Sequence, residues 1–177
     1  MAYTIVPQHV VAYREKDVLR RLSASPVRPE TLLSAVLAVK VAATVIGAVL
    51  VLGVGGLALG LSVPQHPIGF AVVFVLGTLA LLSLGLLIAA QARTVGAATA
   101  IGMLLFFPSM FLGGIYVPSE QLPGALRRIG EITPLGALLQ ALRDSWVGGG
   151  PQPLHLAVLA MATVVFGVLA ARTFRWE

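Results

Sequence analysis

Residues 107–123 read FPSMFLGGIYVPSEQLP, and this stretch decides how the rest of the chain is arranged. It begins as the apolar end of a membrane helix and is then interrupted by a glycine pair and by prolines. Proline removes a backbone donor and glycine loosens the chain, so one continuous helix is not expected here. Broken backbone at membrane depth survives only where protein or water covers it. We therefore expect two short outer re-entrant helices over residues 118–147, between two full spans. The residues that break the chain are Gly113, Gly114, Pro118, Pro123 and Pro134.

The two short helices are expected to be amphipathic. The first covers residues 122–132, with Leu122, Leu126 and Ile129 on one face and Arg127, Arg128 and Glu131 on the other. The second covers residues 135–146 and ends in Arg143 and Asp144, after which the run GGGP at 148–151 closes the element. Arg143 and Asp144 have two interpretations: a locally paired helix end, or an anchor that fixes the short helices against neighbouring spans and shapes an outer gate.

The composition indicates an integral membrane protein. The chain has 177 residues, of which 58% are hydrophobic and 11% are charged, whereas an average soluble domain carries about 25% charged residues. Spans are predicted at about 31–61, 68–90, 95–116 and 153–171, because each is long and apolar enough to cross a bilayer. The predicted fold class is therefore all-α and polytopic, with about four transmembrane helices, a cytoplasmic amphipathic helix and the two short outer helices.

The first 30 residues are predicted to form a cytoplasmic or interfacial segment, followed by a transmembrane domain over residues 31–177. The densest charge lies at residues 14–30, where Val18, Leu19 and Leu22 make a narrow apolar stripe at helical spacing before Pro26 ends the helix. One interpretation is a helix held to anionic lipid by its cations. The other is a helix that contacts a partner protein in the cytoplasm.

The distribution of cations predicts the orientation. With the N-terminal segment inside, nine Lys and Arg residues lie on the cytoplasmic side and three lie outside. Short cytoplasmic loops carry the excess of Lys and Arg, so both termini are expected in the cytoplasm, with the protein in the plasma membrane. The inside set is Arg14, Lys16, Arg20, Arg21, Arg28, Lys40, Arg93, Arg172 and Arg175; the outside set is Arg127, Arg128 and Arg143.

Catalytic chemistry is not expected in this chain. The glycines at 53–56 are not followed by Lys-Ser or Lys-Thr, so the phosphate-binding loop is lacking. There is no cysteine, and the three histidines stand on different segments without a carboxylate at ligand spacing. We expect no catalytic residue, no metal site, no cofactor in this chain and no nucleic-acid partner. An apolar wall at the end of the third span has two interpretations, packing or contact with a hydrophobic substrate: Met103, Phe106, Phe107, Met110 and Phe111.

The order of breakers resembles that of the membrane (permease) subunit of type-2 ABC exporters, which include bacterial drug and lipid efflux permeases. The matching pieces are LGGIYVP at 112–118, LP at 122–123, TPL at 133–135 and ALR at 141–143. The segment LRRLSASPVRP at 19–29 is similar to the cytosolic element of that family, in which a charged helix ends at a Ser/Thr-Pro step before a span. Family members usually carry two further spans ahead of this helix, so the resemblance implies a permease truncated at its N-terminus.

The resemblance implies export of a hydrophobic drug, lipid or glycolipid, powered by a cytoplasmic ABC ATPase that binds ATP and magnesium. It also implies a second permease subunit in a homodimer or heterodimer. A non-transporting membrane anchor or assembly protein remains the alternative. The residues expected to couple the chain to the ATPase are Arg14, Lys16, Leu19, Arg20, Arg21, Leu22, Ser25 and Pro26, and those of the outer gate are Gly113, Gly114, Pro118, Pro123, Pro134, Arg143 and Asp144.

Overall fold

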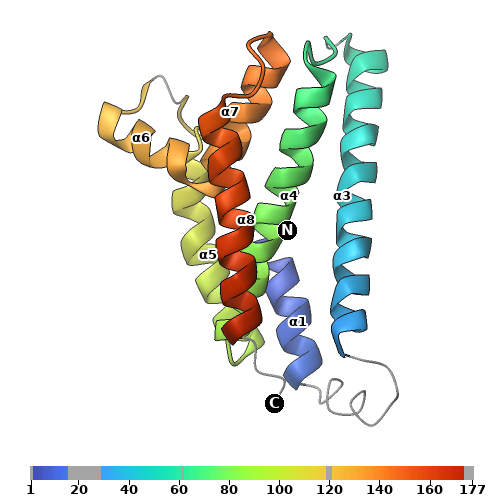
Figure 1. The fold of residues 1–177 in the computed structure, drawn as a ribbon, viewed down its shortest axis with the longest axis vertical. Helices are drawn as coiled ribbons and strands as arrows, with labels where there is room; N and C mark the ends of the chain where they lie inside the picture. The colour runs from blue at the N-terminus through green and yellow to red at the C-terminus, as the bar shows by residue number, and fades with distance from the viewer. Residues whose placement is uncertain (1, 16–28, 61, 119–120, 174–177) are drawn as a thin grey trace.

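The computed structural model describes residues 2–15, 29–60, 62–118 and 121–173, and every regular element in these ranges is a helix (Figure 1). Four helices are long and apolar enough to cross a membrane, with the first span running Ala38–Ala58 inside its helix. The prediction of an all-α polytopic membrane protein is thus confirmed. The helices are α1 (Ile5–Glu15), α3 (Pro29–Leu59), α4 (Pro67–Gln91), α5 (Val95–Leu112), α6 (Gly124–Ile132), α7 (Pro134–Val147) and α8 (Pro153–Thr173).

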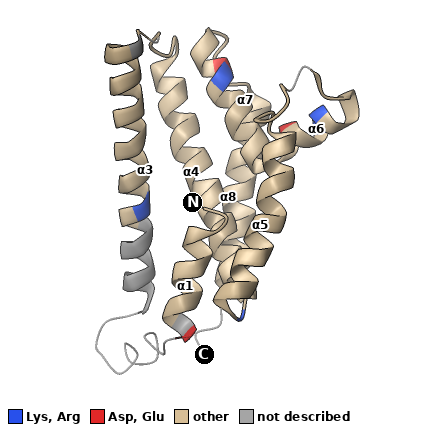
Figure 2. Cartoon of the chain, turned by 180° about the vertical axis from the view of Figure 1, so that it is seen from behind, with Lys and Arg blue, Asp and Glu red and all other residues tan. Residues whose placement is uncertain are grey.

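The core of the bundle lies where α4, α7 and α8 meet. Val73 and Ala80 of α4 are fully buried against Ala137 and Ala141 of α7 and Leu159 of α8. Most of these side chains are small. Because lipid tails are as apolar as leucine, membrane helices associate through close packing rather than through a hydrophobic drive, and small residues permit that packing. The sequences of α4 and α5 contain no charged residue, and both helices are without blue or red in Figure 2. Such sequences suit the middle of a bilayer.

The first residues of the chain, for which the sequence allows either the tail of a span or a surface segment, form α1. This helix packs between α4 and α5. Val6, Val10 and Val11 are each exposed by 3% or less. Gln8 donates a hydrogen bond to Thr99, at 2.9 Å. Glu15 accepts one from the backbone N–H of Val95, also at 2.9 Å, and so caps the start of α5.

Two glycines allow α1 to come this close. A side chain at Gly85 of α4 would collide with the backbone carbonyl of Ala2, and one at Gly102 of α5 would collide with the carbonyl of Tyr3. The Tyr3 ring then packs against Phe106 of α5, with 5.7 Å between the ring centroids. The backbone of the first residues therefore rests directly on the two neighbouring helices.

We expect Gly102→Ala to destabilise the protein by about 1–3 kcal/mol, which is the usual cost of overpacking. The added methyl group would meet the backbone carbonyl of Tyr3, which cannot move aside as a flexible side chain would. Gly96→Ala is the matched control, since it lies in the same helix with open space around its Cα. The measurement is the thermal unfolding midpoint in detergent. Equal midpoints for the two variants would show that α1 does not depend on this contact.

Candidate outer gate

The end of α5 is built around a left-handed glycine. Gly114 has φ 78°, which L-residues with a side chain rarely adopt. Its N–H donates to the carbonyl of Phe111 at 3.2 Å, and the N–H of Ile115 donates to the carbonyl of Met110 at 3.2 Å. This pair of bonds is the Schellman motif, which satisfies helix-end carbonyls. The predicted break at Gly113 and Gly114 is therefore a helix terminus, so α5 ends at Leu112, whereas we predicted a span to residue 116.

A tight corner joins α6 to α7. The hydroxyl of Thr133 donates to the carbonyl of Gly130 at 2.7 Å and accepts from the N–H of Gly136 at 3.3 Å, so one side chain serves both helix ends. Pro134 occupies the first turn of α7, where its missing N–H costs nothing. A side chain at Gly130 would meet the carbonyl of Leu112, and one at Gly136 would meet that of Gly130. The corner is therefore pressed against the end of α5.

Arg143 connects the second short helix to this helix end. Its guanidinium donates to the carbonyl of Gly114 at 3.1 Å, across 29 residues of sequence. The carbonyl belongs to the left-handed residue that ends α5, where no intrahelical partner is available. The geometry agrees with the interpretation of Arg143 as an anchor of the short helices. The predicted breakers Pro118 and Pro123 lie in the connection between α5 and α6.

The packed face of α6 differs from the predicted one. Leu122, just ahead of the helix, and Gly130 are buried, whereas Ile129 is 47% exposed and Ile132 is 61% exposed. Arg127 and Glu131 form an exposed ion pair at 3.0 Å on the helix surface. The assignment of Ile129 to the packing face was wrong, because α6 contacts α5 through the backbone at Gly130 rather than through a row of large side chains.

A second cluster of polar groups lies at the end of α7, and sequence reasoning did not find it. Nδ1 of His155 in α8 lies 3.6 Å from Oδ2 of Asp144, and the His155 side chain is only 5% exposed. At the start of α4, the His66 N–H donates to the carbonyl of Ser145 at 3.1 Å. The His66 ring lies 2.9 Å from the carbonyl of Gly148. The sequence places the three histidines on different segments, yet two of them meet the end of α7. Asp144 and His155 lie on either side of the glycine-rich turn at 148–151, and this short separation in sequence is the signal that could have predicted their contact.

His66 thus links the start of α4 to the end of α7, and His155 brings the start of α8 beside Asp144. They do not amount to a metal centre: within the described ranges, no three His, Cys, Asp or Glu side chains come together as ligands. Their arrangement supplies positioning rather than chemistry.

The predicted apolar wall of α5 divides between two surfaces. Met103, Phe107 and Phe111 stand four residues apart on one exposed face, with 48%, 56% and 41% of each residue exposed. Phe106 instead packs against Tyr3, and Met110 is half-buried, with its sulfur 4.0 Å from the Tyr116 hydroxyl. Three of the five residues predicted for the apolar wall therefore lie on the exposed face of α5.

The predicted coupling residues fall mostly outside the described ranges. This applies to Lys16, Leu19, Arg20, Arg21, Leu22, Ser25 and Pro26. Arg14 lies on the last turn of α1, at the end of the bundle where α5 begins. The prediction that these residues couple the chain to an ATPase stays a prediction.

Comparison with protein families adds the decisive observation. The family model described as ABC-2 type transporter matches residues 1–146, which include α1, α3, α4, α5 and α6 and nearly all of α7. The chain belongs to this family. Membership implies association with an ATPase subunit and movement of a transport substrate. Searches of curated proteins and of solved structures gave no match.

We expect Arg143→Ala to loosen the end of α5. A hydrogen bond to a charged group contributes about 1.5–3 kcal/mol, and its loss leaves the Gly114 carbonyl without its donor. Backbone amides at Gly113, Gly114 and Ile115 should then exchange faster with deuterated water. Arg128→Ala is the control, because Arg128 lies on the exposed side of α6. Identical exchange in the two variants would contradict the anchoring role.

Proposed function

We propose that this ABC-2 family member is the permease subunit of an ATP-driven exporter, moving a hydrophobic drug, lipid or glycolipid out of the cell. The family match over residues 1–146 is the observation that carries the proposal. Two features favour a hydrophobic substrate. The sequences of α4 and α5 contain no charged residue, and α5 presents an exposed apolar face through Met103, Phe107 and Phe111. Within a bilayer this face is open to apolar molecules, including a hydrophobic substrate.

Energy is assigned to a separate cytoplasmic ATPase. The sequence has no phosphate-binding loop, so ATP and magnesium would bind on that partner and this chain would not be an enzyme. The proposal includes a second permease subunit, either a copy of this chain or a related one. The coupling contact is assigned to the segment from Arg14 to Pro26, which combines cations with an apolar stripe.

The outer gate is assigned to α6, α7 and the end of α5. Three separate groups hold this element: the Schellman turn at Gly114, the Thr133 cap and the Arg143 anchor. A rigid element at the mouth of the pathway restricts the movements that transport requires to a few hinge positions. The left-handed turn at Gly114 is one such position.

We expect Gly114→Val to impair export more than membrane insertion. A β-branched residue forced to the left-handed conformation costs roughly 1–2 kcal/mol or more, so the turn and its contact with Arg143 should shift. Gly149→Val is the control, since that glycine lies in an open loop with nothing near its Cα. Drug or lipid efflux is measured in cells that hold the permease and its ATPase, normalised to inserted protein.

Arg143→Ala should reduce the same normalised efflux. Full efflux in both Gly114→Val and Arg143→Ala would make the element a passive cap. No efflux from the unaltered chain with its ATPase would instead favour the anchor or assembly role.

The orientation is tested by reporter fusions. The loops after Gln65 and Gly149 lie at one end of the bundle, because His66 bonds to Ser145 and Gly148 there. Arg93 lies at the other end, two residues before Val95, whose N–H donates to Glu15. We expect fusions after Gln65 and Gly149 to report the outside, and fusions after Arg93 and Trp176 to report the cytoplasm, as the excess of cations requires. A cytoplasmic signal after Gly149 would overturn the outer position of α6 and α7.

A further inference from the structure

The helix α3 stands at the edge of the bundle, and most of its length is open. Val51 is 71% exposed and Leu57 is 93% exposed, and Figures 1 and 2 both place α3 on the flank away from α5. Its contacts with the bundle are chiefly with α4. Two partly open cavities lie between α3 and the bundle, and both include Thr44 in their walls, so they adjoin within one helical turn.

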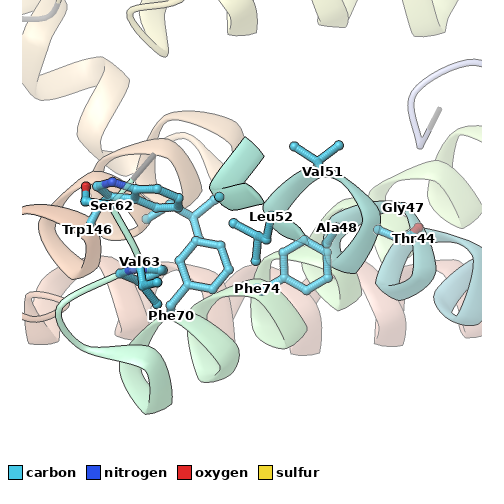
Figure 3. A pocket seen from close by; sticks show the side chains of 13 residues that line it. Thr44, Gly47, Ala48, Val51, Leu52, Ser62, Val63, Phe70, Phe74 and Trp146 are labelled. Carbon is cyan, nitrogen blue, oxygen red and sulfur yellow. The ribbon is translucent and has the colours of Figure 1, made fainter. Parts of the chain in front are cut away.

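The larger cavity, of about 450 Å³, is apolar (Figure 3). Gly47, Ala48 and Leu52 of α3 form one wall, and Phe70 and Phe74 of α4 form the other. Trp146 closes the far end, with its ring centroid 5.9 Å from that of Phe70. Figure 3 places Phe74 beside Ala48, toward the end of the cavity that holds Thr44.

The second cavity, of about 370 Å³, carries a cation. It is lined by Lys40 and Ala43 of α3, by Thr78 and Leu82 of α4, and by Val6 of α1. Lys40 lies two residues inside the apolar span Ala38–Ala58 and is half-buried. A charge at this depth is costly unless it is paired or reaches the headgroups. Among the described residues, the ion pair of Arg127 with Glu131 and the neighbouring side chains of Asp144 and His155 lie elsewhere.

We propose that this groove binds one anionic phospholipid from the leaflet on the Lys40 side. The phosphate would lie at Lys40, and an acyl chain would follow α3 past Thr44 into the aromatic cavity. From Lys40 to Gly56 the helix rises about 24 Å at ~1.5 Å per residue, which exceeds the ~15 Å half-thickness of the hydrocarbon core. The groove is therefore long enough for a full acyl chain.

The shape and charge of the groove favour lipid over a protein helix. Each cavity falls within the ~300–1,000 Å³ typical of small-ligand sites, whereas a helix with its side chains is about 10–12 Å wide. A single cation at one end and apolar walls beyond it match the two parts of an anionic lipid. This site is distinct from the exposed face of α5 and does not depend on the proposed transport activity.

The test is acyl-chain quenching of a single tryptophan in lipid vesicles. Phe74→Trp, combined with Trp146→Phe and Trp176→Phe, places the reporter in the apolar cavity. Two kinds of vesicle are compared, both made mainly of unlabelled phosphatidylcholine. One contains a small fraction of phosphatidylglycerol brominated at mid-chain, and the other contains the same fraction of phosphatidylcholine brominated at mid-chain. We expect brominated phosphatidylglycerol to quench the fluorescence of this tryptophan with about five-fold higher apparent affinity than brominated phosphatidylcholine. This factor corresponds to the attraction of about 1 kcal/mol between one lysine and an anionic headgroup.

Matched variants assign the effect to the groove. Lys40→Gln should remove the preference for phosphatidylglycerol, whereas Arg93→Gln, at the same end of the bundle, should preserve it. Gly47→Leu should fill the cavity and reduce quenching by both lipids, because nothing lies within 4 Å of a Cβ there. Gly53→Leu, on the same helix with equal room but outside the cavity walls, should not. Equal quenching by the two lipids would overturn the proposal, and so would a preference for phosphatidylglycerol that survives Lys40→Gln. Absence of quenching by either lipid would also overturn it, because it would mean that protein fills the groove.

Discussion

The structure depends on satisfying the backbone where the chain is broken between α5 and α8. In hydrocarbon an unpaired N–H or C=O costs several kcal/mol, so only helices or covered backbone can exist at membrane depth. Three groups of hydrogen bonds meet this constraint at the breaks near Gly114 and Thr133. The turn at Gly114 lets the N–H groups of Gly114 and Ile115 donate to carbonyls at the end of α5. Thr133 serves two helix ends, and Arg143 supplies a donor to the carbonyl of Gly114. The broken element is therefore built from paired groups, which makes it a defined structure rather than a loop.

Close approach of backbones is the second requirement, and glycine meets it at particular places. Gly130 brings α6 against the carbonyl of Leu112, and Gly102 of α5 admits the carbonyl of Tyr3, just ahead of α1. Gly77 of α4 leaves room for the Leu138 side chain of α7. Such close contacts matter in lipid because the hydrophobic effect gives little preference for one apolar neighbour over another there. The many glycines of the sequence thus act as contact points, not only as breaks.

Much of the fold could be predicted because its signals are local. Hydropathy located the four spans, and Gly114 and Pro134 marked the breaks after α5 and before α7, although α5 ends four residues earlier than predicted. The features that sequence reasoning missed depend on distant partners. Ile129 has the spacing of a packed residue, yet Gly130 makes the contact. His155 meets Asp144 only because α7 and α8 turn sharply at residues 148–151. Burial of α1 had a visible signal in Val6, Val10 and Val11, but the segment was too short to count as a span.

Packing is firm at the centre of the bundle and sparse on its two flanks, and the two surfaces proposed to carry function lie on those flanks. The buried residues shared by α4, α7 and α8 form the firm centre. α5 lies on one flank with its exposed Met103, Phe107 and Phe111, and α3 lies on the other with its groove (Figures 1 and 2). Elements with few buried contacts open at lower free-energy cost than the core, so α3 is the span whose position a bound lipid would affect most. A lipid at Lys40 and a substrate at Phe107 would occupy opposite sides of α4, so neither would exclude the other by direct contact.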